Sequence, residues 1–161
     1  MAVAEAIKAT EAHAIQMFPH LRESDRNEIA ASSNLRPRSA LVCSVRNSTK
    51  AWTAMLDDEP VVMFGVGCVS MMSGVGSPWL LGTDRIRDIR TQFLRDSDWY
   101  ISEMLEEFPK LTNHVDARNK LTLRWLKWCG FQIFDAEAYG CKGLPFHRIL
   151  LKKQEWEKKH V

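Results

Sequence analysis

Two residues capable of acid–base chemistry stand two positions apart in the second half of the chain, His114 and Asp116. They fall in a short strand candidate, 113–116, and side chains two apart on a strand share one face. A histidine beside a carboxylate can act as a general base with its orienting partner. A structural histidine with satisfied hydrogen bonds is the alternative, so the pair is a candidate catalytic site.

A basic turn follows a short apolar strand candidate at 78–82. Thr83 or Asp84 can cap a helix that begins there, and Arg85 and Arg87 lie in its first turn. A helix start leaves about four unpaired N–H groups and the positive end of the helix dipole, which together suit a phosphate. A capped helix with a solvated basic turn is the alternative interpretation.

Other familiar site chemistries are missing from the sequence. The Gly-Val-Gly triplets at 65–67 and 74–76 lack the further residues of phosphate-binding loops, so we expect a closely packed strand and a turn. The cysteines have neither zinc nor thioredoxin spacing, which predicts no metal site and four reduced, mostly buried thiols: Cys43, Cys68, Cys129 and Cys141. Trp125 and Trp128 are interleaved with basic residues, but their spacing favours a buried helix face over nucleic-acid contact.

The composition is that of an ordinary globular domain. The 161 residues fit one domain, and 45% hydrophobic with 26% charged residues exclude a disordered or fibrous chain. A net charge of +2 gives no reason to expect specific nucleic-acid binding. No cleavable signal is expected at the start, because Glu5 and Lys8 interrupt its apolar stretch. The uncharged stretch 60–83 contains Pro78 and several glycines, so we expect two buried strands and no membrane span.

Hydrophobic spacing and turn signals predict the order of elements along the chain. The predicted elements are a strand at 13–18, helices at 25–32 and from Pro37, hairpin strands at 52–56 and 61–69, a strand at 78–82, a helix over 86–108, a strand at 113–116, a helix at 121–128 ended by Gly130, strands at 131–134 and 146–151, and a charged tail at 152–161. Hairpins and helical crossovers together require a mixed α/β fold, with a mixed, twisted sheet and helices on both faces.

Several segments carry a family resemblance. Residues 119–131, NKLTLRWLKWCGF, resemble the Asn-x-x-Ala-x-x-x-Tyr-x-x-x-Gly-Phe signature of the GNAT superfamily, the Gcn5-related N-acetyltransferases. More closely, the chain resembles the internal virion protein A family of short-tailed bacteriophages over about 21–152, through DRNE (25–28), MFGV (63–66), PWLLGTD (78–84), VDARN (115–119), YG (139–140) and PF (145–146). The resemblance implies a single GNAT-like domain over 1–161, with the charged tail at its end.

The superfamily resemblance implies that acetyl-CoA, or another acyl-CoA, binds where the fourth and fifth strands separate. Carried onto this chain, the implied cofactor-binding residues are Leu80, Leu81, Gly82, Thr83, Asp84, Arg85, Ile86, Arg87 and Asn119. Two positions depart from the family pattern. Residues 84–87 supply no glycine for close approach to a pyrophosphate, and Leu126 stands where the family has its acid tyrosine, which leaves His114 or a water to supply the proton.

In this superfamily the acceptor site is shaped by the first helices and the last strands, here about 24–47 and 131–150. Asp25, Glu28, Glu137 and Tyr139 are candidates for it, and each is equally plausible as a surface or capping residue. The resemblance implies a phage-encoded acyl-CoA-dependent N-acyltransferase that acts on a host or phage protein or a small amine. The alternative is a catalytically inactive factor in virion morphogenesis or host-protein interaction. Either would work in the host cytoplasm, with transient association with the assembling virion.

Overall fold

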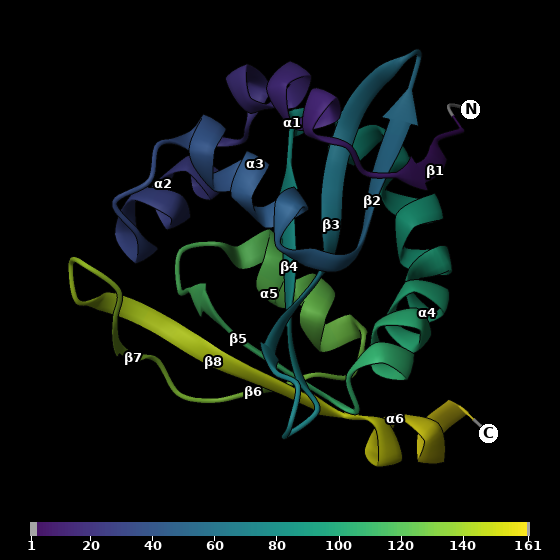
Figure 1. Cartoon of the computed structure of the whole chain (residues 1–161), viewed down its shortest axis with the longest axis vertical. Coiled ribbons are helices and arrows are strands. Elements are labelled where there is room, and N and C mark those ends of the chain that lie inside the picture. Colours follow the sequence, from purple (N-terminus) through teal and green to yellow (C-terminus); the bar gives the residue numbers. More distant parts are fainter. Residues whose placement is uncertain (1–2, 161) are drawn as a thin grey trace.

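A mixed eight-stranded sheet forms the centre of the molecule in a computed structural model that describes residues 3–160 (Figure 1). The strands lie in the order β1-β2-β3-β4-β5-β8-β6, and β7 also pairs with β8. The β4–β5 pair is parallel and the other described pairs are antiparallel, which confirms the predicted mixed sheet. The strands are β1 (Glu5–Lys8), β2 (Ser48–Leu56), β3 (Glu59–Ser70), β4 (Val75–Gly82), β5 (Lys110–Asp116), β6 (Gln132–Ile133), β7 (Glu137–Tyr139) and β8 (Leu144–Lys152).

Helices cover both faces of the sheet, as predicted. On one face α1, α2 and α3 pack against Met63 and Leu81, and on the other α4 and α5 pack against Phe64 and Leu80. Met63 pairs with Leu81 and Phe64 with Leu80 across β3 and β4. Because neighbouring side chains on a strand alternate, the first pair points to one face of the sheet and the second pair to the other. The helices are α1 (Glu11–Met17), η1 (Phe18–His20), α2 (Glu23–Ser32), α3 (Pro37–Arg46), η2 (Asp84–Ile89), α4 (Arg90–Glu107), α5 (Lys120–Trp128) and α6 (Lys153–His160), where η marks 3₁₀ helices.

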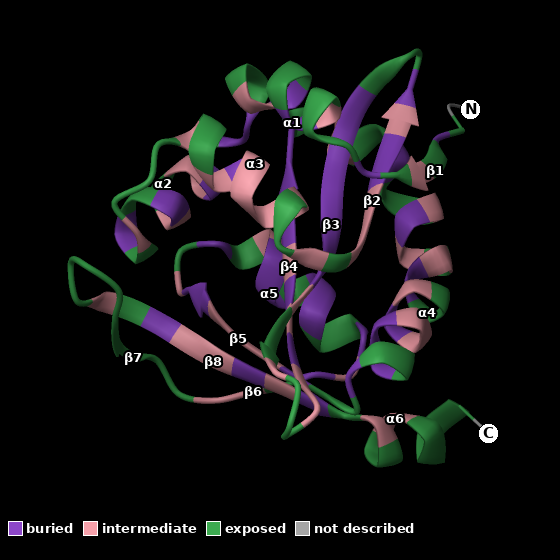
Figure 2. Cartoon of the chain, in the orientation of Figure 1, coloured by how far each residue is buried: buried purple, intermediate pink, exposed green. Residues whose placement is uncertain are grey.

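The uncharged stretch 60–83 forms the long antiparallel pair β3–β4, which confirms the prediction of two strands joined by a turn (Figure 2). The first glycine triplet allows close packing, because a Cβ at Gly65 would collide with the carbonyl of Lys50. Gly74 lies in the turn with φ +64°, a conformation that glycine adopts without strain. Among residues 3–160, no helix combines the length and apolarity needed to cross a bilayer.

One predicted element is wrong, and the charged tail is helical where no helix is predicted. The run 13–18 belongs mainly to helix α1 and not to a strand, because the Thr10 side chain accepts from the N–H of His13 and caps it. Ala14 and Met17, one helical turn apart, are its buried residues. The charged tail forms helix α6, whose Trp156 packs onto the core.

Other details differ from the expectation as well. The helix predicted to begin at Asp25 begins at Glu23, and Asp25 lies inside its first turn, where its carboxylate bonds elsewhere. Trp125 is buried as predicted, but Trp128 is 65% exposed because the apolar face of α5 has turned away from its last residue. The cysteines are free, but of the four only Cys129 is buried, since Cys68 and Cys141 lie in exposed segments.

Candidate functional site

The parallel strands β4 and β5 separate soon after they meet. Their pairing covers Val75 with Lys110 and Gly76 with Leu111, and no further pair is formed along the described chain. Beyond it, the Asn113 side-chain amide donates to the Pro78 carbonyl at 2.7 Å and spans the widening gap. Proline has no N–H to lose on this edge, which is why a strand inside the sheet tolerates it. The gap between the two strands is therefore a built feature of the fold.

The gap exposes main-chain hydrogen-bonding groups on the edge of β4 that β5 leaves unpaired. The main-chain groups of Pro78 and Gly82 point away from β3 and are bonded to other groups. Because every second residue of a strand points its N–H and C=O to the same side, those of Leu80 point into the gap. At Gly82 the edge is closed, because its N–H donates to Asp25 Oδ2 at 2.9 Å and its carbonyl accepts from Arg22 N–H at 2.9 Å. Leu80 is thus the position where an extended ligand could hydrogen-bond to β4.

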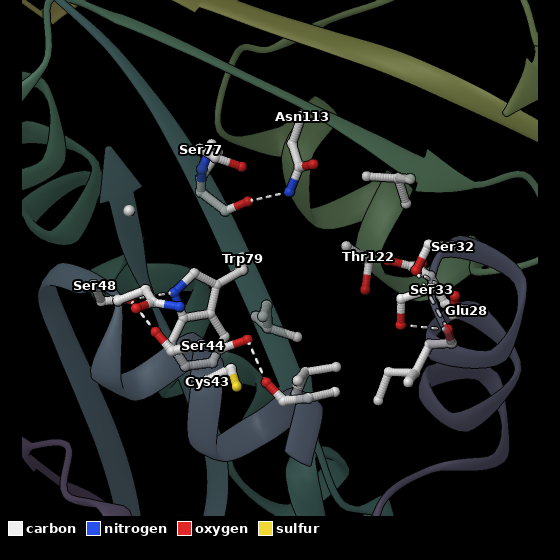
Figure 3. A pocket seen from close by; sticks show the side chains of 18 of the residues that line it. Glu28, Ser32, Ser33, Cys43, Ser44, Ser48, Ser77, Trp79, Asn113 and Thr122 are labelled. Atoms are coloured by element: carbon white, nitrogen blue, oxygen red, sulfur yellow. Dashed lines mark hydrogen bonds between the residues drawn. The ribbon is translucent and has the colours of Figure 1, made fainter. Parts of the chain in front are cut away.

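On the α2–α3 side of β4 the gap opens into a cavity of about 370 Å³, which we call the hydroxyl cavity (Figure 3). It lies between α2, α3, β4 and the start of α5, and serine hydroxyls from three of these elements face it. Its polar lining includes Glu28, Ser32, Ser33, Ser44, Ser48, Ser77, Asn113 and Thr122. Glu28 is the one ionisable carboxylate in this lining, so it dominates the chemistry of the cavity.

Glu28 is held in a fixed orientation by bonds to one of its two oxygens. Its Oε2 accepts from Asn119 Nδ2 at 2.9 Å and from the Asp116 N–H at 3.3 Å, while Oε1 has no partner within residues 3–160. Burial raises the pKa of Glu28 to about 7; the nearby Asp25 and Asp116 carboxylates add to the rise, and the Asn119 bond opposes it. A carboxylate with such a pKa can take a proton near neutral pH, which is the property of a general base.

Asp25, expected as an acceptor or capping residue, is fully buried and tied to the scaffold. Its two oxygens accept from Arg22 Nε at 2.9 Å and Nη2 at 2.8 Å, a bidentate ion pair. The same carboxylate accepts from the Gly82 N–H and from Asn119 Nδ2. Asp25 therefore joins α2, the end of β4 and the start of α5, and leaves no oxygen facing the cavity without a partner.

On the opposite side of β4, between η2, α4 and α5, lies a second cavity of about 300 Å³, which we call the arginine groove. Arg87, Arg90 and Arg124 line it, no carboxylate does, and among residues 3–160 none of the three forms an ion pair. Its apolar wall includes Ile86, Phe93, Leu121 and the exposed Trp128. Leu80, Thr122 and Trp125 line both cavities. A phosphate ligand would find cationic partners in this groove and not in the hydroxyl cavity.

The residues of the predicted phosphate turn, 83–87, do not all lie at one site. Thr83 caps the turn as expected, since its side chain accepts from the Arg85 N–H at 3.3 Å. The Arg85 guanidinium points away from the gap and pairs with Asp57, Glu59 and Asp88. Asp84 is exposed, beside a separate cavity lined by His20, and Ile86 and Arg87 face the arginine groove. Sequence reasoning missed Arg90 and Arg124, because the helical spacing of α4 and α5 marks them only as solvent-facing charges.

His114 and Asp116 are not brought together as a base and its orienter. Asp116 forms a bidentate ion pair with Arg118, at 3.0 and 2.7 Å, which lowers the pKa of its carboxyl against the opposing effect of burial. The His114 ring stacks on Tyr139 at 3.9 Å, with Nε2 3.8 Å from Glu137 Oε1. His114, Glu137 and Tyr139 thus form their own cluster on β5 and β7, and none of them lines the hydroxyl cavity.

Helix α5 positions the remaining predicted residues. Asn119 caps it and holds Glu28, but it is buried and lines neither the hydroxyl cavity nor the arginine groove. Leu126 is buried and lines the hydroxyl cavity, so this helix position offers no proton donor. Trp125 is fixed by a 2.9 Å bond from its Nε1 to Ser97 Oγ on α4.

Comparisons with known proteins bear on this architecture. No family model matches the chain, and no curated protein matches its sequence. Its structure is similar to aminoglycoside acetyltransferase AAC(6')-Ib in complex with coenzyme A, at 15% identity and TM-score 0.70 over 99% of this chain and 100% of that one. It is also similar to a GNAT-family acetyltransferase from Streptococcus pneumoniae (12% identity, TM-score 0.63, covering 93% and 99%). A spermidine N-acetyltransferase chimera from Vibrio cholerae and hSSAT is another (12%, 0.63, 96% and 98%). The chain therefore has the fold of the GNAT acetyltransferases.

Proposed function

We propose that this protein is an acyl-CoA-dependent N-acyltransferase. The observation that carries the proposal is the placement of Glu28 in a cavity that opens from the same strand gap as the arginine groove. One side offers cations for phosphate groups, and the other offers a carboxylate that can take a proton from an amine. Solved structures of the same fold contain coenzyme A or acetyl-CoA, which supports this class of cofactor.

The residues present fit such a cofactor. Arg87, Arg90 and Arg124 would hold its phosphates, and the free N–H and C=O of Leu80 would bond amide groups of its extended arm. Ile86 and Trp128 would pack against apolar and aromatic parts of the molecule. When bound, acyl-CoA supplies a thioester whose carbonyl carbon bonds the amine nitrogen while the thiolate leaves.

Glu28 has the catalytic role in this proposal. Its free Oε1 takes a proton from the acceptor ammonium, so that the nitrogen gains the lone pair it needs. Asn119 keeps the other oxygen in place and is a positioning residue. Leu126 lines the cavity and has no proton to donate. The leaving thiolate is therefore protonated by solvent and not by a side chain of α5.

The segments that resemble the phage family support a finer proposal. We infer that the protein is phage-encoded, works in the host cytoplasm and acylates an amine of a host or phage molecule. The alternative, an inactive factor in virion morphogenesis or host-protein interaction, is favoured by Leu126 at the position of the family tyrosine. The active enzyme and the inactive factor are distinguished by whether acyl transfer to an amine takes place.

A thermal-shift measurement with acetyl-CoA tests the proposal. Ligand at about 100 times its dissociation constant adds roughly 2.7 kcal/mol to the free energy of unfolding, which raises the melting midpoint of a domain this size by about 2–5 °C. We expect that shift at low salt, together with release of free thiol when an amine panel is added. No shift with millimolar acetyl-CoA would overturn cofactor binding, and a shift without transfer to any amine would favour the inactive alternative.

A further inference from the structure

The charge of the hydroxyl cavity limits what its occupant can carry. Among residues 3–160, Glu28 alone of those that line it bears a formal charge, and no lysine, arginine, histidine or aspartate takes part. The neighbouring acids Asp25 and Asp116 are buried and paired with Arg22 and Arg118. Each already has an arginine partner and lies outside the lining, so the lining itself offers one carboxylate to one cation.

Two of the serine hydroxyls, those of Ser32 and Ser44, add a second, directional constraint. Ser32 Oγ donates to the Glu28 carbonyl at 2.8 Å, and Ser44 Oγ donates to the Ala40 carbonyl at 2.8 Å. Each hydroxyl has one hydrogen, so these bonds leave only acceptor lone pairs for the cavity. A ligand that bonds to Ser32 and Ser44 must therefore bring its own O–H or N–H donors.

A large part of the remaining wall is apolar, and Trp79 in it is firmly held. The Trp79 indole donates to Ser48 Oγ at 2.7 Å, so its ring is fixed against the cavity. Leu81, Val115 and Leu126 line other parts of the wall. A second ammonium group placed against this surface would lose water without gaining a counter-charge, which is strongly unfavourable.

From these three features we infer that the acceptor is a small primary monoamine whose other polar groups are neutral hydrogen-bond donors, and not a polyamine. The inference rests on the proposed function for the direction of transfer, but the selectivity of the cavity follows from its own lining. The volume of about 370 Å³ lies in the range of small-molecule sites. Glu28 receives the ammonium, and the acceptor oxygens of Ser32 and Ser44 receive the neutral donors.

Two amines of equal length test this inference: 6-aminohexan-1-ol, with one charge and one hydroxyl, and 1,6-diaminohexane, with two charges. We expect titration calorimetry of the full chain at pH 8, without acetyl-CoA, to give at least about tenfold tighter binding of the aminoalcohol, since an uncompensated charge costs more than the 1.4 kcal/mol of one decade. Equal or tighter binding of the diamine would overturn the inference. So would failure of the aminoalcohol to bind.

A charge introduced into the cavity provides the matched control. Ser44→Asp adds a second carboxylate, while Ser44→Asn adds a group of the same shape without charge. We expect Ser44→Asp to raise the diamine-to-aminoalcohol affinity ratio at least tenfold over Ser44→Asn, and an unchanged ratio would contradict the assigned role of cavity charge. Because these titrations contain no cofactor, selective binding without acyl transfer would count against the proposed function alone.

Discussion

The hydroxyl cavity and the arginine groove are built from the same strand and the same helix, yet they have opposite charge. Leu80, Thr122 and Trp125 line both, whereas Glu28 belongs to one and Arg87, Arg90 and Arg124 to the other. Arg85, two residues before Arg87, forms ion pairs with three carboxylates and points away from the groove. The difference teaches that a basic sequence does not locate an anion site. The direction of each side chain and the absence of a nearby carboxylate decide which arginine is available.

Glu28→Gln tests the acidic side of this comparison and should have the largest effect on activity. Removing a general base lowers the rate of acyl transfer by about 100-fold or more, while affinity for acetyl-CoA at the arginine groove should be unchanged. Steady-state kinetics from pH 6 to 9 would measure it, and the wild-type rate should rise with pH through about 7 as Glu28 loses its proton. Glu23→Gln, an exposed change on the same helix, is the control. Equal loss in both variants would remove Glu28 from catalysis.

Asp25→Ala tests whether the residue that joins α2, the end of β4 and the start of α5 belongs to the scaffold. The substitution leaves the buried Arg22 without its partner, a situation that costs about 3–5 kcal/mol of unfolding free energy. Urea denaturation would measure it. A loss near 1 kcal/mol, the typical value of a lost helix cap, would contradict the buried-pair interpretation.

Single alanine variants of Arg87, Arg90 and Arg124 test the cationic side. Each should weaken coenzyme A binding by about tenfold through the loss of a charge-assisted contact, and the loss should shrink as salt is added. Arg85→Ala is the matched control and should change the affinity by less than about twofold, because its guanidinium already pairs elsewhere. The reverse order, in titration calorimetry, would move the phosphate site to the turn at 83–85.

The pH dependence of stability tests the raised pKa of Glu28 without cofactor or acceptor. The pKa of Glu28 is raised from its ordinary 4.5 to about 7 in the folded protein, so folding favours the protonated form. Its contribution is complete below about 4.5 and is lost as the pH rises through about 7. At pH 8 Glu28→Gln, which stays neutral, should therefore be more stable than the wild type by roughly 1–3 kcal/mol, and at pH 4 this advantage should vanish. Denaturation at the two pH values measures it, and a constant difference would contradict the raised pKa.

Local patterns were enough to predict most of the elements. The apolar run of β3, the turn at Gly74 and the helical spacing of α4 and α5 depend on neighbours within a few residues, so the mixed sheet and its two helical layers could be anticipated. The run 13–18 failed because its apolar residues fit a strand and a helix equally, and the cap at Thr10 decided between them. Glu28 is an acceptor-site candidate already in the sequence, but its spacing from Asp25 equally fits a capping box, so the sequence does not decide between the two roles.

The sequence by itself determined most of the alternation of strands and helices and some of the residues able to form a phosphate or amine site, among them Arg87 and Glu28. Only the tertiary structure decided which of them meet. Glu28 bonds Asn119, 91 positions further along the chain, and Arg124 of α5 lines the same groove as Arg87 of η2. Such contacts depend on how β4 and β5 diverge and on which face each helix buries. Hydrophobic packing of the whole chain fixes both, and no short stretch of sequence records them.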